Sequence, residues 1–249
     1  MDSNRLKDLL ESVRTGEVGV DGAVDQLSQL PYLDTGQARI DTHRAVRQGI
    51  PEVIYGESKT AEQIIDGARA LRGVGQEVLA TRVSAEKATA ICAALPESCY
   101  DEASRVLYLG AEEVPVQGKG TILIVSAGSA DFPVAAEAQK VAQRFGNKVE
   151  LLQDVGVAGL HRLLASLDLL RSARVLIVVA GMEGALPSVV GGLVDKPVIA
   201  VPTSVGYGVA MGGMAALMGM LTSCASNVTT VNIDNGFGAA HVATLINRL

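Results

Sequence analysis

Polar residues that could bind or transform a ligand gather in short glycine-rich segments, each directly after an apolar run. The segments are Gly128-Ser129-Ala130-Asp131, Asp154-Val155-Gly156, Gly181-Met182-Glu183-Gly184, Thr203-Ser204 and Asp234-Asn235-Gly236. Glycine lets backbone N–H groups approach an oxyanion, and a Ser or Asp side chain can bind a phosphate or a ribose hydroxyl. Each segment alone is a weak signal, but together they favour a nucleotide-binding site.

Glu183 is the only charged residue between Val175 and Val194. A carboxylate buried among apolar strands is costly unless it has a partner, which favours a role as an acid, a base or a ligand contact. The alternative is a charge at a helix N-terminus that accepts hydrogen bonds from backbone donors.

Cys224 lies in the run Leu-Thr-Ser-Cys-Ala-Ser-Asn, between an apolar helix and the last predicted strand. A reactive thiol needs polar, partly exposed surroundings, so Cys224 is a candidate nucleophile. The alternative is a buried apolar cysteine, which suits Cys92 inside its predicted helix. The spacing of Cys92, Cys99 and Cys224 indicates neither a disulfide framework nor a zinc site.

Four of the charged residues in an N-terminal segment without a hydrophobic period, residues 38–60, are candidates for a binding site. Asp41, Arg44 and Arg47 are spaced three apart and would share one face of a helix, and Lys59 follows them. A solvated charged face is one interpretation. The glycine, proline and tyrosine residues of this segment favour the other, an anion clamp, because long segments without a period tend to carry function.

The elements that must position these residues alternate regularly in the second half of the chain. Strands are predicted over residues 121–126, 148–153, 175–180, 198–201 and 228–233, and helices over residues 133–145, 159–170, 184–194, 209–223 and 237–247. Strands that are apolar throughout indicate a parallel sheet buried on both faces. Ligands bind such sheets at the carboxyl ends of the strands, where the strand order reverses.

The first half of the chain is predicted to be a smaller helical and α/β region. Helices are expected over residues 4–15, 21–30, 60–71 and 84–95, and strands over residues 76–82 and 104–109. Residues 110–118 contain Pro115 and two terminal glycines and form the best linker. We therefore predict two domains: residues 1–118, a helical hairpin plus a small α/β unit, and residues 119–249, a nucleotide-binding catalytic domain.

Composition excludes several classes of function. The 249 residues include 21 Lys+Arg and 27 Asp+Glu with no basic run and few aromatics, which argues against a nucleic-acid partner. Residues 197–221 are the most membrane-like, but Pro202, Thr203 and Ser204 interrupt them, so no membrane partner is expected. The first eight residues lack the apolar region of a secretory signal, so a cytoplasmic location is expected.

Four blocks of the second half resemble the PurE-type carboxylases of purine synthesis. They are residues 128–133, 180–187, 197–202 and 234–240. The resemblance implies a PurE-like three-layer domain with a central parallel sheet. Those enzymes carry a histidine in Ser-Ala-His-Arg where this chain has Asp154-Val155-Gly156, and another in Ala-Ala-His-Leu-Pro where it has Glu183-Gly184-Ala185-Leu186-Pro187. The missing histidines argue against the purine-pathway reaction.

The N-terminal block from Arg39 to Thr60, together with the layout of the whole chain, is similar to LarB, the family of nickel-pincer nucleotide biosynthesis carboxylases. This resemblance implies an enzyme that carboxylates the pyridinium ring of nicotinic acid adenine dinucleotide at C5 with CO2. It also implies hydrolysis of the phosphoanhydride, which releases AMP and pyridinium-3,5-biscarboxylate mononucleotide. No tightly bound cofactor is implied, although Mg²⁺ near the diphosphate would assist the hydrolysis, and no dedicated metal motif is present.

The resemblance also implies roles for particular residues. Cys224 matches the family's cysteine, whose thiolate adds to C4 of the ring and makes C5 nucleophilic. Glu183 and Asp131 are the candidates for proton transfer. The expected substrate-binding residues are Gly128, Ser129, Asp131, Gly181, Gly184, Asp234, Asn235, Gly236, Arg44, Arg47 and Lys59.

The resemblance further implies an assembly, because PurE-like proteins form octamers. The uncharged run of residues 209–220 suits a helix buried between subunits, so a homo-octamer is expected. Two other functions stay open: a PurE-like carboxylase or mutase acting on another ribonucleotide, and a noncatalytic nucleotide-binding regulator.

Overall fold

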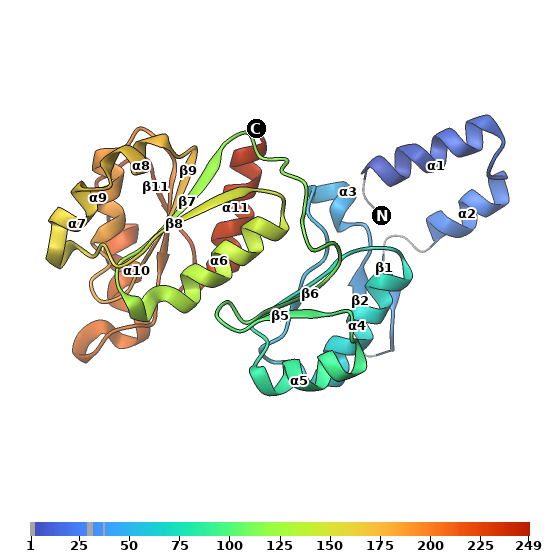
Figure 1. Ribbon diagram of the computed structural model, residues 1–249, viewed down its shortest axis with the longest axis horizontal. Helices are drawn as coiled ribbons and strands as arrows, with labels where there is room; N and C mark the ends of the chain where they lie inside the picture. The colour runs from blue at the N-terminus through green and yellow to red at the C-terminus, as the bar shows by residue number, and fades with distance from the viewer. Residues whose placement is uncertain (1–2, 29–31, 37) are drawn as a thin grey trace. The chain divides into compact units, whose positions relative to one another are not determined.

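The computed structural model describes residues 3–28, 32–36 and 38–249 (Figure 1). The chain divides into two compact units, residues 1–111 and 112–249, and the division falls within the predicted linker. Each unit combines strands with helices, and the second contains a central parallel sheet flanked by helices. The predicted α/β fold class is confirmed.

The first unit begins with α1 (Ser3–Thr15) and α2 (Val20–Ser28). The predicted end of the second helix, at about residue 30, lies outside the described residues. Two short strands, β1 (Tyr32–Asp34) and β2 (Arg39–Asp41), then pair antiparallel and precede α3 (Arg44–Gln48). Residues 38–60 therefore contain regular structure after all, but its elements are too short to show a hydrophobic period.

A four-stranded sheet completes the first unit, in the order β3-β4-β6-β5. Its strands and helices are β3 (Ile54–Tyr55), α4 (Ala61–Gly73), β4 (Val78–Thr81), α5 (Ala85–Ala94), β5 (Cys99–Asp101) and β6 (Val106–Leu109). Thr60 and Ser84 cap α4 and α5 with side chains that accept hydrogen bonds from the first helical turn. Thr60 Oγ1 accepts a hydrogen bond from Gln63 N at 3.3 Å, and Gln63 Oε1 accepts one from Thr60 N at 3.0 Å.

The second unit is built on a five-stranded sheet in the order β11-β10-β9-β7-β8, in which every neighbouring pair is parallel. Its strands are β7 (Thr121–Ser126), β8 (Lys148–Leu152), β9 (Val175–Ala180), β10 (Val198–Pro202) and β11 (Val228–Thr230). The chain runs from β7 to the edge strand β8 and then crosses to β9 on the other side of β7. The strand order therefore reverses between β7 and β9, where a ligand site is expected.

Helices surround this sheet (Figure 1). They are α6 (Phe132–Arg144), α7 (Leu160–Leu164), α8 (Leu167–Ser172), α9 (Leu186–Leu193), α10 (Met214–Leu221) and α11 (Gly236–Arg248), with short 3-10 turns over residues 129–131, 157–159 and 208–213. All six residues of β9, at the centre of the sheet, are buried. Within the described ranges, no helix has both the length and the apolar character needed to cross a bilayer.

Two predicted helices differ from the structure. The helix predicted over residues 159–170 is interrupted, and the chain forms α7 and α8 instead. The helix predicted over residues 209–223 begins only at Met214, because Met211 (φ 48°) and Gly212 (φ 63°) are left-handed and break a right-handed helix.

A buried amide network joins the end of α11 to the start of the sheet. Asn247 Oδ1 accepts from Gly120 N at 3.0 Å, and Asn247 Nδ2 donates to Gly120 O at 2.9 Å and to Asn147 Oδ1 at 2.9 Å. Asn147 Nδ2 in turn donates to Thr244 Oγ1 at 2.9 Å. Buried polar groups that lose their partners are costly, so this network holds the second unit together.

Asn247→Ala is expected to lower the free energy of unfolding by about 3 kcal/mol, because it removes the hydrogen-bond partner of the part-buried Gly120 backbone and of the buried Asn147 Oδ1. Urea denaturation checks the value. Asn232→Ala removes an exposed amide and is expected to cost less than about 1 kcal/mol. Equal losses in the two variants would contradict the role of the network.

Candidate active site

A cavity of about 370 Å³ opens where the strand order reverses. Its walls come from the loops after β7 (residues 127–131), β8 (residues 154–158) and β9 (residues 180–186), together with Arg162 of α7 and Val205. Five predicted site residues line it together: Gly128, Ser129, Asp131, Gly181 and Glu183. This geometry agrees with the prediction that the polar loops at the carboxyl ends of the strands form one site.

Asp131 is the most constrained group in the cavity wall. Its side chain is buried, at 4% exposure. One carboxyl oxygen accepts from Thr203 Oγ1 at 2.6 Å, and the other accepts from Gly128 N at 2.9 Å. Burial raises the pKa of Asp131, and the hydrogen bonds from Thr203, Gly128 and Gly181 only partly offset that rise. A carboxyl with a raised pKa inside a ligand cavity is suited to accepting or donating a proton.

Thr203→Val is expected to raise the pKa of Asp131 further, because the fully buried hydroxyl donates to the charged carboxylate and favours it. The ¹³C chemical shift of the Asp131 carboxyl, followed against pH, checks this. Thr222→Val, which removes an exposed hydroxyl bonded to Met218 O, serves as the control and should leave the titration unchanged. If the Asp131 carboxyl of Thr203→Val has its titration midpoint at or below that of the wild type, the hydrogen bond does not stabilise the charged carboxylate.

The loop after β9 brings Glu183 to the cavity in an exposed position. The expectation that this carboxylate would be buried among apolar strands, and would need a partner for that reason, is wrong. The loop's shape depends on its glycines. A Cβ at Gly181 would lie 2.3 Å from Val205 O, and one at Gly184, whose φ is +66°, would lie 2.7 Å from Ala216 O. These glycines allow the loop to pack closely against its neighbours.

An ion pair closes another side of the cavity. Arg162 Nη1 lies 2.9 Å from Asp154 Oδ2, and both residues line the wall. Among the described residues that line this cavity, Arg162 is the one cation and no histidine occurs. Asp154 (φ 56°) and Met182 (φ 54°) both adopt left-handed backbone conformations in the strand-end loops. Such strain is typical of positions that shape a ligand site.

Cys224 does not line this cavity. It is exposed, so the alternative of a buried apolar cysteine is excluded. Its turn, between α10 and β11, lies beside α9. Ser188 Oγ donates to Ser223 Oγ at 2.8 Å, and Asn227 Nδ2 donates to Gly191 O at 3.1 Å. The turn that carries Cys224 therefore lies beside the helix whose N-terminal loop carries Glu183, and Cys224 itself is not part of the cavity wall.

The loop after β11 makes structural contacts of its own. Asp234 Oδ1 accepts from Ser204 N at 2.8 Å, and Asn235 Oδ1 caps α11 by accepting from Gly238 N at 2.8 Å. Gly236 is buried, and a Cβ there would lie 2.4 Å from Val134 O of α6. None of the three lines the cavity, so their role in substrate binding stays a prediction.

The N-terminal arginines are paired with carboxylates. Arg47 Nη2 lies 2.7 Å from Asp41 Oδ2, and Arg44 Nη2 lies 3.2 Å from Glu52 Oε2. Asp41 belongs to β2 and the arginines to α3, so the three do not share one helix face. The Arg47 side chain holds the pKa of Asp41 below its usual value, whereas burial raises the pKa of Glu52. An anion at the predicted clamp would therefore compete with these carboxylates.

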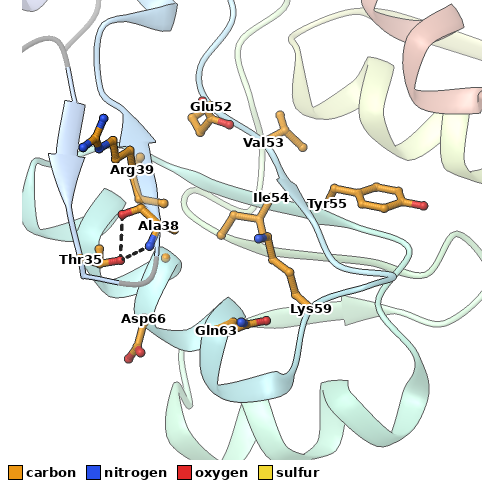
Figure 2. A pocket seen from close by; sticks show the side chains of 12 residues that line it. Thr35, Ala38, Arg39, Glu52, Val53, Ile54, Tyr55, Lys59, Gln63 and Asp66 are labelled. Atoms are coloured by element: carbon orange, nitrogen blue, oxygen red, sulfur yellow. Dashed lines mark hydrogen bonds between the residues drawn. The ribbon is translucent and has the colours of Figure 1, made fainter.

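Lys59 lines a second cavity, of about 240 Å³, within the first unit (Figure 2). Figure 2 shows its side chain directed toward Ile54, whereas the Tyr55 ring points away. The wall also carries Arg39, Glu52 and Asp66. Arg44 and Arg47 do not line this cavity, so the structure does not gather the three predicted cations around one pocket.

Sequence analysis missed two features of the first cavity. Arg162 could not be predicted as a site residue because it lies in a helix, eight residues after Asp154, and not in a strand-end loop. The contact of Thr203 with Asp131 joins residues 72 positions apart, which no local pattern reveals. The position of Thr203 just after a predicted strand was the one sequence feature that indicated a role for it.

This fold and cavity define a class: an α/β protein whose parallel sheet presents a ligand site at its carboxyl edge, where the strand order reverses. Comparison with known proteins makes the class specific. Residues 32–111 match the family profile described as LarB/PurE-like N-terminal domain, and residues 121–249 match that described as AIR carboxylase. The chain therefore belongs to the AIR carboxylase family and is a LarB-like protein with a PurE-like C-terminal domain.

Two relatives come from Methanocaldococcus jannaschii. One, described as an uncharacterized protein, is 37% identical over 253 residues, which cover 98% of this chain and 97% of the relative. The other, an N5-carboxyaminoimidazole ribonucleotide mutase, is 34% identical over 132 residues, or 51% of this chain and 79% of the relative. The family supports a carboxylase-type or mutase-type function in nucleotide metabolism.

Proposed function

We propose that this protein carboxylates C5 of the pyridinium ring of nicotinic acid adenine dinucleotide and hydrolyses its phosphoanhydride, as LarB-like proteins are expected to do. The observation that carries the proposal is the order of the two matched domains, a LarB-type N-terminal domain before an AIR carboxylase domain. The cavity supports it, because no histidine stands among its described lining residues where the resemblance to the purine enzymes would require one.

The proposed reaction begins with Cys224. A pyridinium carbon is electron-poor and does not attack CO2, but addition of the thiolate to C4 gives a dihydropyridine whose C5 is enamine-like and nucleophilic. C5 then attacks the carbon of CO2 and forms the new carboxylate. Loss of the C5 proton to a base and departure of the thiolate restore the aromatic ring. Cys224 is exposed and is therefore open to a substrate.

Asp131 is our candidate for the base that removes the C5 proton, and Glu183 is the alternative. Burial raises the pKa of Asp131, so its carboxylate is a stronger base than an exposed aspartate, whereas Glu183 is exposed. Arg162 lines the same cavity and is our candidate for binding an anionic group of the substrate, which would compete with its ion pair to Asp154. Phosphate binding by Arg44, Arg47 and Lys59 stays a prediction, and the two arginines are each paired with a carboxylate.

The test offers the purified protein either nicotinic acid adenine dinucleotide or N5-carboxyaminoimidazole ribonucleotide and follows both by chromatography. We expect consumption of the dinucleotide with release of AMP. Conversion of the ribonucleotide instead would favour the mutase function, and binding without conversion of either would favour a noncatalytic regulator.

We further propose that a second copy of the chain completes the site, in a homo-octamer. Cys224 lies outside the cavity that holds Asp131, so chemistry that needs both requires another copy or a rearrangement. The neighbouring surface supports an interface, because its large apolar residues are exposed: Tyr207, Val209, Met211, Met214, Met218 and Leu221. Exposed apolar patches of this kind mark sites of protein association.

Mixed assembly tests the shared site. Cys224→Ser and Asp131→Asn subunits, each inactive alone, are expected to regain roughly a quarter of wild-type activity when reassembled at equal amounts, because a site is intact only when both contributing copies are the right variant. Activity of the mixture, measured with the oligomeric state by light scattering, checks this. No recovery in a mixed oligomer, or a monomeric wild-type protein, would contradict the shared site.

A further inference from the structure

The second cavity, which lies within the first unit, has an apolar floor. Ile40 of β2 and Ile54 of β3 are buried there, and Val53 and Gly67 line the wall with them. A Cβ at Gly67 would lie 3.2 Å from Ile54 Cδ1 and 3.7 Å from Ile40 Cδ1, so both side chains pack against α4 at this glycine. The cavity volume, about 240 Å³, is below the roughly 300 to 1,000 Å³ of pockets that hold drug-sized ligands. The cavity therefore suits a small molecule with an apolar body.

One ammonium group projects into this cavity. The Lys59 side chain is partly buried, and Figure 2 shows it directed toward Ile54 on the apolar floor. Within the described part of the chain, no residue accepts a hydrogen bond from Lys59 Nζ or forms an ion pair with it. Asp66 also lines the cavity, but it is exposed and its side chain is directed away from that of Lys59 (Figure 2). An ammonium group held against apolar side chains loses part of its hydration, and a bound anion would compensate for that loss.

Two other charged residues of the wall are already paired. Arg39 Nε lies 3.4 Å from Asp34 Oδ2, and Glu52 Oε2 lies 3.2 Å from Arg44 Nη2. Each pair is neutral and leaves no charge for a ligand to balance. Among the described residues that line the cavity, Lys59 is therefore the one charged group that is both directed into it and without a counter-charge.

The surroundings of Lys59 suit a carboxylate better than a phosphate. Phosphate groups are usually held by several backbone N–H groups of a helix N-terminus or by arginine side chains. At the start of α4, Thr60 Oγ1 already accepts from Gln63 N at 3.3 Å, and Gln63 Oε1 accepts from Thr60 N at 3.0 Å. Arg44 and Arg47, predicted to bind phosphate together with Lys59, do not line this cavity. A single ammonium group is enough to bind a singly charged carboxylate.

We propose that this cavity binds a small monocarboxylate with an apolar or aromatic body, with the carboxylate on Lys59 Nζ and the body against Ile40, Val53 and Ile54. The ion pair and the burial of apolar surface supply the affinity, and no covalent bond forms. All the residues that line the site belong to the first unit, and none takes part in the proposed chemistry at Cys224. The site is therefore additional to the proposed function and does not depend on it.

Protection of Lys59 against acetylation tests the site at the level of one residue. The full-length protein is treated briefly with acetic anhydride, with or without sodium benzoate, and mass spectrometry of its peptides gives the acetylation rate of each lysine. Benzoate is expected to slow acetylation of Lys59 about tenfold, because the bound carboxylate covers the amine and keeps it protonated. Benzamide has the same ring without the charge and should protect Lys59 little. Lys7, which is exposed and does not line the cavity, is the internal reference and should react equally in all samples.

Substitution of the lysine tests the same site by calorimetric titration with benzoate. Lys59→Gln is expected to weaken binding roughly tenfold to a hundredfold, since a hydrogen bond between two charged groups is lost. Lys59→Arg, which keeps the positive charge, should retain most of the binding. Lys7→Gln is the matched control, because it removes one positive charge outside the cavity, and it should leave binding unchanged.

Phenyl phosphate, used in the same acetylation experiment, separates the two kinds of anion. Protection of Lys59 by benzoate and not by benzamide supports the proposed site. No protection by benzoate, or equal protection by benzoate and benzamide, would overturn it, and protection by phenyl phosphate alone would overturn the choice of a carboxylate. None of these measurements uses the dinucleotide or follows turnover, so failure of this inference is distinguishable from failure of the proposed function.

Discussion

Cys224→Ser is expected to lower kcat for carboxylation about 10⁴-fold or more, because an alkoxide is not available at neutral pH to replace the thiolate and the C4 adduct does not form. Binding of the dinucleotide should persist, since the substitution changes one exposed atom. Product formation measured with labelled CO2, together with calorimetric titration of the dinucleotide, separates these two effects.

Two other cysteines provide the controls for this substitution. Cys99→Ser changes another exposed thiol and Cys92→Ser a partly buried one, both in the first unit, and each should retain nearly full activity. A Cys224→Ser protein that carboxylates at the wild-type rate would remove the covalent adduct from the mechanism. Equal losses in all three variants would point to a general effect of the substitution on folding.

Asp131→Asn is the second substitution with a large expected effect, a loss of about 10² to 10⁴ in kcat, which is the range for removal of a general base. Asparagine cannot accept the C5 proton, and its NH2 group opposes one of the donors that bond the carboxyl, Gly128 N or Thr203 Oγ1. The acid limb of the wild-type pH–rate profile should reflect the raised pKa of Asp131: activity rises with pH as the carboxyl loses its proton.

Carboxylates of the same cavity provide the comparison. Asp154→Asn alters an exposed carboxylate paired with Arg162 and is expected to cost less than about tenfold. Glu183→Gln separates the two candidate bases. A large loss in Glu183→Gln with nearly full activity in Asp131→Asn would assign proton transfer to Glu183.

The core strands of the second unit could be predicted from the sequence because their pattern is strong. The predicted bounds of β7 and β9 agree with the structure, since each is an aliphatic run buried on both faces and bounded by polar or glycine residues. The starts of α4 and α5 also follow from local chemistry, because Thr60 and Ser84 are residue types that cap helices. The two- and three-residue strands β1, β2, β3 and β5 are too short to show any period.

The late start of α10 depends on tertiary contacts that a sequence pattern does not contain. A Cβ at Gly213 would lie 2.7 Å from Thr203 O, so the chain must approach β10 closely before the helix begins. The left-handed residues Met211 and Gly212 make that approach. Helical propensity alone therefore predicted too early a start.

The sequence was sufficient to predict that the loops after the strands form one site. Topology places residues at the ends of β7 and β9 beside each other, which brings Asp131 and Glu183 to one cavity. The exposure of Glu183 and the position of Cys224 beside α9 depend on how α9 and α10 pack, and residue spacing does not determine that packing.

The central claim concerns the substrate and the bond that forms, and mass spectrometry of the products tests it most directly. The protein is incubated with nicotinic acid adenine dinucleotide and ¹³C-bicarbonate. We predict pyridinium-3,5-biscarboxylate mononucleotide carrying one ¹³C, together with an equal amount of unlabelled AMP. An unchanged dinucleotide, or a mononucleotide without the label, would contradict the proposed function.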